Sequence, residues 1–209
     1  MRKIAVILIA VMMVIGLAAC GSSEEAGSDS GSAGSSSAAE SSAASEGSSA
    51  AGGSDVLVVY FSQTGNTKGV AEKIADIEGA DIYEIEAAKE YTSDDLNYDD
   101  PESRATVEQN DPSARPEIGN EPVSLEGYKK IYIGYPIWWG QEPRIMDTFV
   151  ESNDFDGITM IPFCTSGSSD IGDSGKNLEK NAGSGNWLDG KRFEGGASED
   201  DVRSWIEGM

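Results

Sequence analysis

The chain of 209 residues contains no histidine, which excludes Ser-His-Asp and Cys-His nucleophile systems and removes the commonest metal ligand. No side chain therefore has an unperturbed pKa near neutral pH. Only two cysteines are present, and 15 Lys and Arg face 37 Asp and Glu. The formal charge of −22 repels nucleic acid phosphates and anionic lipid surfaces, so neither is an expected partner.

Long hydrophobic runs are also missing. The longest, from Ile4 to Leu17, has about 14 residues, whereas a helix that spans a bilayer needs roughly 20. Two basic residues precede this run and Ala18-Ala19-Cys20 follows it, which is the layout of a signal peptide. The ending resembles a bacterial lipoprotein signal, in which Cys20 is lipidated and becomes the first residue of the mature chain. A plain signal peptide cut after Ala19 is the alternative.

The segment from Gly21 to Gly53 lacks aromatic residues and aliphatic residues larger than alanine. Because such a segment cannot bury enough apolar surface to offset its ordering entropy, we expect a disordered tether. Its mean reach is on the order of 30 Å. The rest of the chain has the size of one domain.

A buried strand, a polar loop and a helix are expected next. Val56–Tyr60 is a continuous apolar run rich in β-branched residues, typical of a parallel strand buried on both faces. After the loop, Val70, Ile74 and Ile77 recur at helical spacing. The loop reads Ser62-Gln63-Thr64-Gly65-Asn66-Thr67. Such residues make ordinary turns, but at a helix start, where N–H groups are unpaired, they favour a bound phosphate.

Two later segments repeat this layout. Lys130–Tyr135 is a predicted strand that runs into Pro136-Ile137-Trp138-Trp139-Gly140, before a helix opened by Pro143. Ile158–Phe163 is a third predicted strand, and it runs into Cys164-Thr165-Ser166-Gly167-Ser168-Ser169. Each strand thus ends in a polar or aromatic loop, as the first does.

Together the three loops resemble the FMN-contacting loops of the flavodoxin family, and the resemblance spans Ser54 to the C-terminus. It implies an FMN cofactor with its phosphate on the first loop and its isoalloxazine ring between the other two. FAD is not expected, because the first loop lacks the G-x-G-x-x-G pattern. The cofactor-binding residues that the resemblance implies are Ser62, Gln63, Thr64, Gly65, Asn66, Thr67, Pro136, Ile137, Trp138, Trp139, Gly140, Thr165, Ser166, Gly167 and Ser168.

Trp138 and Trp139 have three possible roles: filling the core, contacting a partner protein, or covering the flavin ring. The resemblance favours the last. We expect Trp139 to stack on the ring, because it precedes Gly140 as the stacking tryptophan does in flavodoxins. An extended loop would send the two indoles to opposite sides. Tyr91 and Tyr98 could cover the flavin or fill a surface groove, and the sequence does not choose.

The order of elements predicts an α/β fold, a parallel sheet with helices on both faces. The resemblance specifies a flavodoxin-like doubly wound five-stranded sheet of order 2-1-3-4-5, with the cofactor beside strands 1 and 3. Alternation over Ala80–Glu86 predicts an edge strand. Pro162 has no backbone N–H to donate to a neighbouring strand, so we expect the strand that starts at Ile158 to end at Ile161 or to contain a bulge. We expect a helix over Pro101–Gln109, capped by Asp100.

Two more helices are expected near the C-terminus. The stretch from Asp173 to Gly185 predicts a weak helix, and Ser198 with Asp201 resembles a capping box for a final one that Gly208 ends. If Cys20 is lipidated, Cys164 is the only free thiol, more typical of a small core residue than of a redox group.

The sequence therefore predicts a signal peptide over 1–19, Cys20 and its tether over 20–53, and a flavodoxin-like FMN-binding domain over 54–209. The leading function is electron transfer by a flavoprotein that its lipid anchor holds on the extracytoplasmic face of the cell membrane. Its partners would be redox proteins or small-molecule electron donors and acceptors. The alternatives are an FMN-dependent quinone-type oxidoreductase, in which arginine stands where this chain has Trp138, and a non-redox binding lipoprotein.

Overall fold

The computed structural model describes residues 53–209. The predicted signal peptide, Cys20 and nearly all of the tether lie outside the described residues. Within the described part, no helix is both long enough and apolar enough to cross a membrane.

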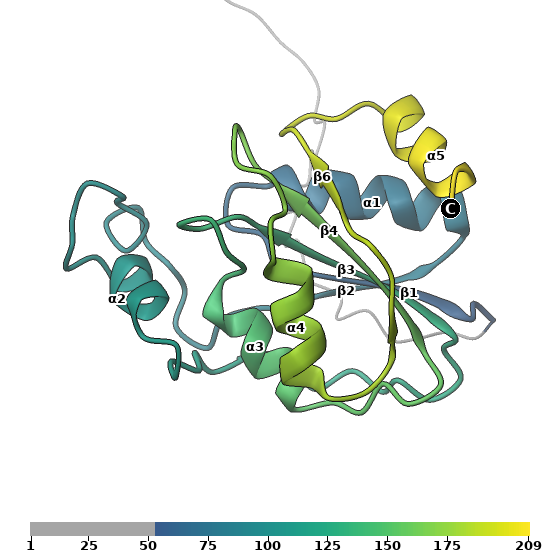
Figure 1. The fold of residues 1–209 in the computed structure, drawn as a ribbon, viewed down its shortest axis with the longest axis horizontal. Helices are drawn as coiled ribbons and strands as arrows, with labels where there is room; N and C mark the ends of the chain where they lie inside the picture. Colours follow the sequence, from purple (N-terminus) through teal and green to yellow (C-terminus); the bar gives the residue numbers. More distant parts are fainter. Residues whose placement is uncertain (1–52) are drawn as a thin grey trace, which may run out of the picture. The chain divides into compact units, whose positions relative to one another are not determined.

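A parallel sheet forms the centre of the fold, and its strand order is β2-β1-β3-β4-β5, with β6 also paired to β4 (Figure 1). This order confirms the predicted topology. The elements are β1 (Val56–Tyr60), α1 (Asn66–Glu78), β2 (Asp81–Glu84), α2 (Arg104–Asn110), β3 (Lys130–Pro136), α3 (Arg144–Glu151), β4 (Thr159–Thr165), α4 (Ser174–Ala182), β5 (Asn186–Trp187), β6 (Lys191–Phe193) and α5 (Glu199–Glu207).

Helices cover both faces of the sheet, because successive residues of a strand point to opposite sides. On β1, Val56 and Val58 pack with α1 and α5, whereas Leu57 and Val59 pack with α3 and α4. Figure 1 shows α1 and α5 above the sheet and α3 and α4 below it. β1 and β3 are therefore buried on both faces, which explains their continuous apolar sequences.

β4 is longer than expected, because Pro162 lies inside it and the strand continues to Thr165. The prediction that this strand ends at Ile161 or contains a bulge was wrong. The neighbouring edge strand is interrupted between β5 and β6, and Gly190 packs against the Pro162 carbonyl at this interruption. The backbone N–H and C=O of one strand residue point to the same side, so the N–H that Pro162 lacks would also point toward this interruption. No paired strand residue lies there to accept it, and the proline is tolerated.

The long connection between β2 and β3 carries α2 to one end of the sheet, away from the other helices (Figure 1). The helix begins later than predicted. Ser103, not Asp100, is its N-cap, and the Ser103 hydroxyl accepts a hydrogen bond from the Thr106 N–H. Serine and aspartate side chains are about equally good at accepting the N-cap hydrogen bond, so residue type alone does not decide which of the two caps the helix.

The C-terminal helices agree with the sequence. α4 is only nine residues long and buries Leu178 completely. Ser198 is the N-cap of α5, where its hydroxyl accepts from the Asp201 N–H at 3.1 Å. Ser198 therefore caps the helix as predicted, but the Asp201 carboxylate accepts from the Ser198 hydroxyl at 2.7 Å, so the two residues do not form the reciprocal backbone bond of a full capping box.

Candidate functional site

A cavity of about 560 Å³ lies at the carboxyl ends of β1, β3 and β4. This is the position at which parallel α/β sheets with a reversal of strand order bind ligands. Its volume falls within the usual range for small-molecule sites. The cavity is lined by Gln63, Thr64, Asn66, Thr67, Leu96, Tyr98, Pro136, Ile137, Trp138, Thr165, Ser166, Gly167 and Gly195.

The start of α1 forms one end of the cavity. Gly65 is the N-cap, with φ of 80°, and no side chain caps the helix. Only glycine adopts this left-handed conformation cheaply. The first helical bond runs from the Gly69 N–H to the Gly65 carbonyl, so the N–H groups of Asn66, Thr67 and Lys68 precede the helical ladder. These donors and the helix dipole make this end attractive to an anion.

Two hydroxyls join this helix to the third loop. The Oγ1 atoms of Thr67 and Thr165 lie 2.8 Å apart, and both threonines are nearly fully buried. Only one hydroxyl proton can lie between the two oxygens. The second proton is therefore available to another acceptor in the cavity.

Ser62 and Thr64 complete the first loop. The Ser62 Oγ atom is buried and has no hydrogen-bond partner within residues 53–209. Thr64 Oγ1 accepts from the Asn66 side-chain amide at 3.2 Å, so its own proton is still free to be donated. A buried polar atom without a partner is costly, and a bound polar ligand would remove that cost.

The second loop is a tight turn. Trp138 and Gln141 exchange two backbone hydrogen bonds, of 2.9 and 3.0 Å. The central residues Trp139 and Gly140 have φ of 48° and 79°, which is the pattern of a type I′ turn. The extended loop expected from the sequence is therefore not present.

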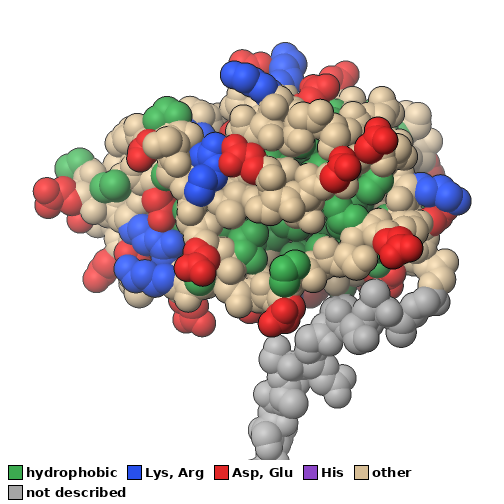
Figure 2. Space-filling view, turned by 90° about the horizontal axis from the view of Figure 1, so that it is seen from below, with side chains coloured by type: hydrophobic (Ala, Val, Ile, Leu, Met, Phe, Trp, Pro, Cys, Tyr) green, Lys and Arg blue, Asp and Glu red, His purple; other side chains and the backbone are tan. Residues whose placement is uncertain are grey.

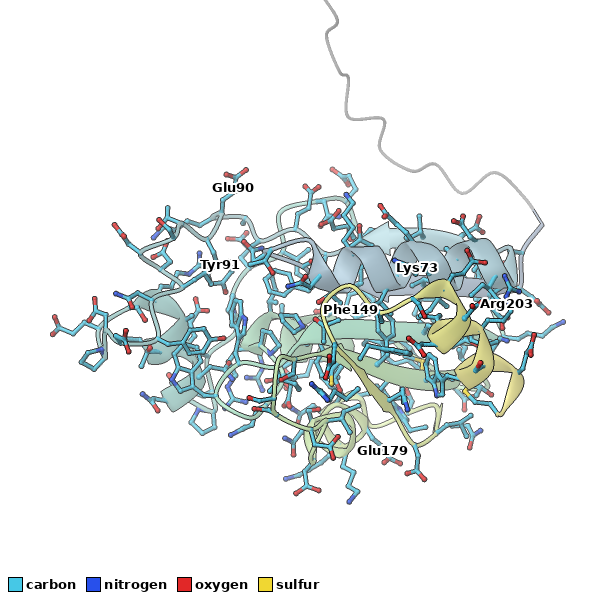
Figure 3. The ribbon with its side chains drawn as sticks, turned by 90° about the horizontal axis from the view of Figure 1, so that it is seen from above. Lys73, Glu90, Tyr91, Phe149, Glu179 and Arg203 are labelled. Carbon is cyan, nitrogen blue, oxygen red and sulfur yellow. The ribbon has the colours of Figure 1, made fainter. Side chains whose placement is uncertain are left out.

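The turn separates the two indoles. Trp138 is only 5% exposed and packs edge-on against Phe61 and Tyr91 in the core, although it also lines the cavity. Trp139 lies instead against Tyr98, with ring centroids 4.2 Å apart and the ring planes at 27°. Two tyrosines left open by the sequence thus take different places: Tyr91 is buried, whereas Tyr98 is 56% exposed. Figure 3 shows Tyr91 directed into the molecule and its neighbour Glu90 directed outward.

The third loop is held by its own serine and by β6. Ser166 Oγ accepts from the backbone N–H groups of Ser168 and Ser169. The Arg192 guanidinium donates to the Ser166 carbonyl at 2.8 and 3.2 Å. Beyond β6, Gly195 packs closely on the Asn66 side chain. A Cβ atom added to Gly195 would lie only 2.8 Å from the Asn66 side-chain oxygen. This contact closes the cavity on the side of α5.

A buried polar cluster lies behind the tight turn. Glu142 is fully buried, with one carboxylate oxygen accepting from the Asn177 amide at 3.3 Å and the other without a partner within the described chain. Burial raises the pKa of the Glu142 carboxyl to about 7, against the attraction of the nearby Arg144 guanidinium. Arg144 pairs instead with the buried Asp147 at 3.4 Å.

Cys164 is buried at the end of β4, and burial raises the pKa of its thiol to about 12. A thiol with such a pKa is a poor nucleophile, which agrees with the expected core role. Among residues 53–209, no group of three or more acidic or cysteine side chains is placed to hold a metal ion.

Most residues proposed from the sequence meet at the cavity, but some do not line it. Ser62, Gly65, Trp139, Gly140 and Ser168 lie in the three loops without forming its wall. Sequence reasoning missed Leu96 and Gly195. Leu96 belongs to an irregular segment without periodicity, and Gly195 is one of many glycines, so neither gave a signal.

The comparisons with known proteins agree on the fold. A family model described as "Flavodoxin" matches residues 55–209. A solved structure from Bacteroides uniformis is 46% identical, with a TM-score of 0.70, and the match covers 73% of this chain and 97% of that one. A second solved structure, from Bacteroides eggerthii, is 42% identical, with a TM-score of 0.69, and the match covers 74% of this chain and 96% of that one.

A flavoprotein from Lactobacillus acidophilus, solved in complex with FMN, has the same fold at 22% identity and a TM-score of 0.54; the match covers 72% of this chain and 97% of that one. No curated protein sequence matches the chain significantly.

Proposed function

The chain belongs to the flavodoxin family, and from this we propose that it binds FMN noncovalently and transfers electrons between redox partners outside the cytoplasmic membrane. The single observation that carries the proposal is the meeting of all three predicted loops at one cavity, on the carboxyl ends of β1, β3 and β4. The FMN-bound relative with the same fold supports the choice of cofactor.

The phosphate end of FMN fits the start of α1. The N–H groups of its first turn, the Thr64 hydroxyl and one proton of the Thr67–Thr165 pair are available as donors. The unpartnered Ser62 Oγ atom belongs to the same loop, but Ser62 does not line this cavity. A phosphate accepts several hydrogen bonds and favours the positive end of a helix dipole, so the donors match its chemistry.

The ring end of FMN fits the part of the cavity that Tyr98, Ile137 and Trp138 line. Trp139 stacks on Tyr98, which lines the cavity, so aromatic side chains gather at this end. Flat conjugated rings stack on aromatic faces and are shielded there from water.

FMN supplies reversible one- and two-electron chemistry when it is bound. The protein supplies a negative field, since the chain carries a formal charge of −22. Figure 2 shows acidic side chains spread over the face seen from below. A negative field disfavours the added negative charge of a reduced cofactor, so it lowers the reduction potential and makes the protein a stronger electron donor.

The location rests on the N-terminal sequence. The lipoprotein-like signal ending at Cys20 supports a lipid anchor on the extracytoplasmic face of the cell membrane. More than one acyl chain would hold the protein firmly, whereas a single chain would hold it only marginally.

The visible absorption spectrum of the purified protein tests the cofactor. We expect a flavin spectrum, either on purification or after incubation with FMN. Protein that stays colourless in excess FMN would refute the proposal. Turnover with a nicotinamide and a quinone then separates the two redox functions: a carrier exchanges electrons stoichiometrically, whereas an oxidoreductase turns over.

A further inference from the structure

Gln109, near the end of α2, reaches the tight turn of the second loop with its side chain. Its Nε2 atom lies 3.0 Å from the Trp138 carbonyl oxygen and 3.1 Å from the Glu142 carbonyl oxygen. The residue is 7% exposed. Because carbonyl oxygens only accept hydrogen bonds, both contacts require the NH₂ group, and this fixes the orientation of the amide.

The two carbonyls that Gln109 bonds stand on either side of the turn. Trp138 is its first residue, and Glu142 directly follows its last residue, Gln141. Each N–H of one amide group therefore holds one end of the turn. The Trp138 carbonyl also accepts from the Gln141 N–H at 3.0 Å, so Gln109 is its second donor. By bonding both carbonyls at once, the amide favours this arrangement of the two ends over others.

The turn needs such support because Trp139 has φ of 48°, the only positive φ of a non-glycine residue within the described chain. A bulky residue in this conformation is strained, and it persists only where its surroundings enforce it. Gln109 is the side chain that bonds the backbone on both sides of Trp139.

The backbone of Gln109 is itself anchored. Its carbonyl oxygen accepts from the Arg144 guanidinium at 3.1 Å, and Arg144 is the first residue of α3. The end of α2 is thereby joined both to the turn and to the helix that follows the turn. The position of the amide is thus set by elements on either side of it.

We propose that Gln109 is a positioning residue of the cofactor site, which holds the Trp138–Gln141 turn and through it sets how Trp139 and Gly140 meet the flavin ring. This inference rests on the proposed function, since it assigns a role toward the same cofactor. It gives the connection between β2 and β3 a part in tuning the flavin, although Gln109 does not line the cavity.

The test compares Gln109→Met, which keeps the length of the side chain but removes both donors, with the wild-type protein. We expect the affinities for FMN and for riboflavin to fall by the same factor, about tenfold, because the turn faces the ring and the phosphate end is unchanged. The oxidised and reduced cofactor should lose affinity by different factors. A redox titration would then show, for each tenfold difference between them, a shift of about 30 mV for a two-electron couple or about 59 mV for a one-electron couple.

Ser103→Ala is the matched control. It removes the cap at the other end of α2, where Ser103 bonds Thr106, and leaves the Gln109 amide in place. We expect lower thermal stability with potentials like those of the wild type. An equal shift in Ser103→Ala and Gln109→Met would overturn the inference, because loosening α2 would then explain both.

Gln109→Asn decides the question if the methionine variant does not fold, since it stays polar but draws the donors back by one methylene. Ring affinity and potentials that match the wild type in the folded variant would reject the positioning role. These outcomes differ from a failure of the proposed function, in which the wild-type protein itself would bind no FMN.

Discussion

The hydroxyls of Thr67 and Thr165 lie 2.8 Å apart, although the residues are 98 positions apart in the chain. Thr67 is in the first turn of α1, and Thr165 is the last residue of β4. This bond fixes the spacing between the first and third loops of the cavity. A contact that joins two ligand-binding loops contributes both to folding and to the shape of the site.

The threonine pair should show coupling in stability and a separate effect on phosphate binding. Thr67→Val and Thr165→Val should each cost about 1 kcal/mol in free energy of unfolding, and the double variant should cost less than the sum, because each single variant leaves one buried hydroxyl unpaired. Chemical denaturation of all four proteins measures this cycle. Strictly additive losses would contradict a direct bond.

The double variant Thr64→Ala with Thr67→Ala should weaken the binding of FMN far more than that of riboflavin. The lost donors face the phosphate, which riboflavin lacks, and hydrogen bonds to a charged group are the stronger ones. Isothermal titration with both ligands measures the two losses. Equal losses would place the phosphate elsewhere in the cavity.

Trp138→Ala should mainly lower the stability of the fold, whereas Trp139→Ala should mainly lower the affinity for FMN. Trp138 is almost completely buried, so its loss should cost about 3–5 kcal/mol in free energy of unfolding. Trp139 is half-buried in the second loop and stacks on Tyr98, so its loss should weaken FMN binding by about 1–3 kcal/mol and raise the potential of the second electron. Denaturation and redox titration of both variants test this. Matching, wild-type-like potentials would eliminate stacking on a tryptophan as the tuning device.

Glu142 should make the protein less stable as the pH rises. Its pKa is raised by burial from 4.5 to about 7, so the folded state binds a proton more tightly than the unfolded state does. The tighter proton binding adds to the free energy of unfolding. This contribution is complete below pH 4.5 and is lost as the pH rises to 7, a change of about 3 kcal/mol. Glu142→Gln keeps the shape without the charge. Its advantage over wild type in denaturation should grow across this window, and a constant difference would contradict the raised pKa.

Cys20→Ser should release the protein from the membrane fraction without changing its flavin content. The proposed anchor is attached to this residue alone, and the flavin loops begin at Ser62. Cell fractionation followed by the spectrum of the soluble variant measures both properties. A variant that stays with the membrane would exclude the lipoprotein assignment.

The sequence predicted well the parts of the fold that local physics determines. β1 and β3 are continuous apolar runs because helices cover both faces of the sheet, and Ser198 caps α5 where it was expected. Pro162 misled the prediction because its tolerance depends on a gap in the neighbouring edge strand, which no local pattern reveals. The start of α2 was displaced because two acceptable caps, Asp100 and Ser103, lie three residues apart.

The candidate site was predictable at the level of loops and less so at the level of side chains. Loop composition identified the three segments that meet at the cavity. Which of Trp138 and Trp139 faces inward depends on the turn type. The sequence did not reveal that type, because tryptophan rarely adopts the positive φ that Trp139 has here. Gln109 gave no signal, since its partners are backbone atoms 29 and 33 positions away.

The long connection between β2 and β3 also bears on how fast the chain can fold. β1 pairs with β3 in a register that places Val56 opposite Lys130, and the ion pair beside it joins Asp55 to Lys129, 74 positions away. The chain between β1 and β3 forms a long loop, and its two ends must meet before this central strand pair gains any stability. The entropy lost on closing the loop therefore slows folding. That entropy grows only logarithmically, by about 0.6 kcal/mol for each doubling of loop length. The connection can therefore gain or lose residues at little thermodynamic cost, provided that α2 still reaches the turn.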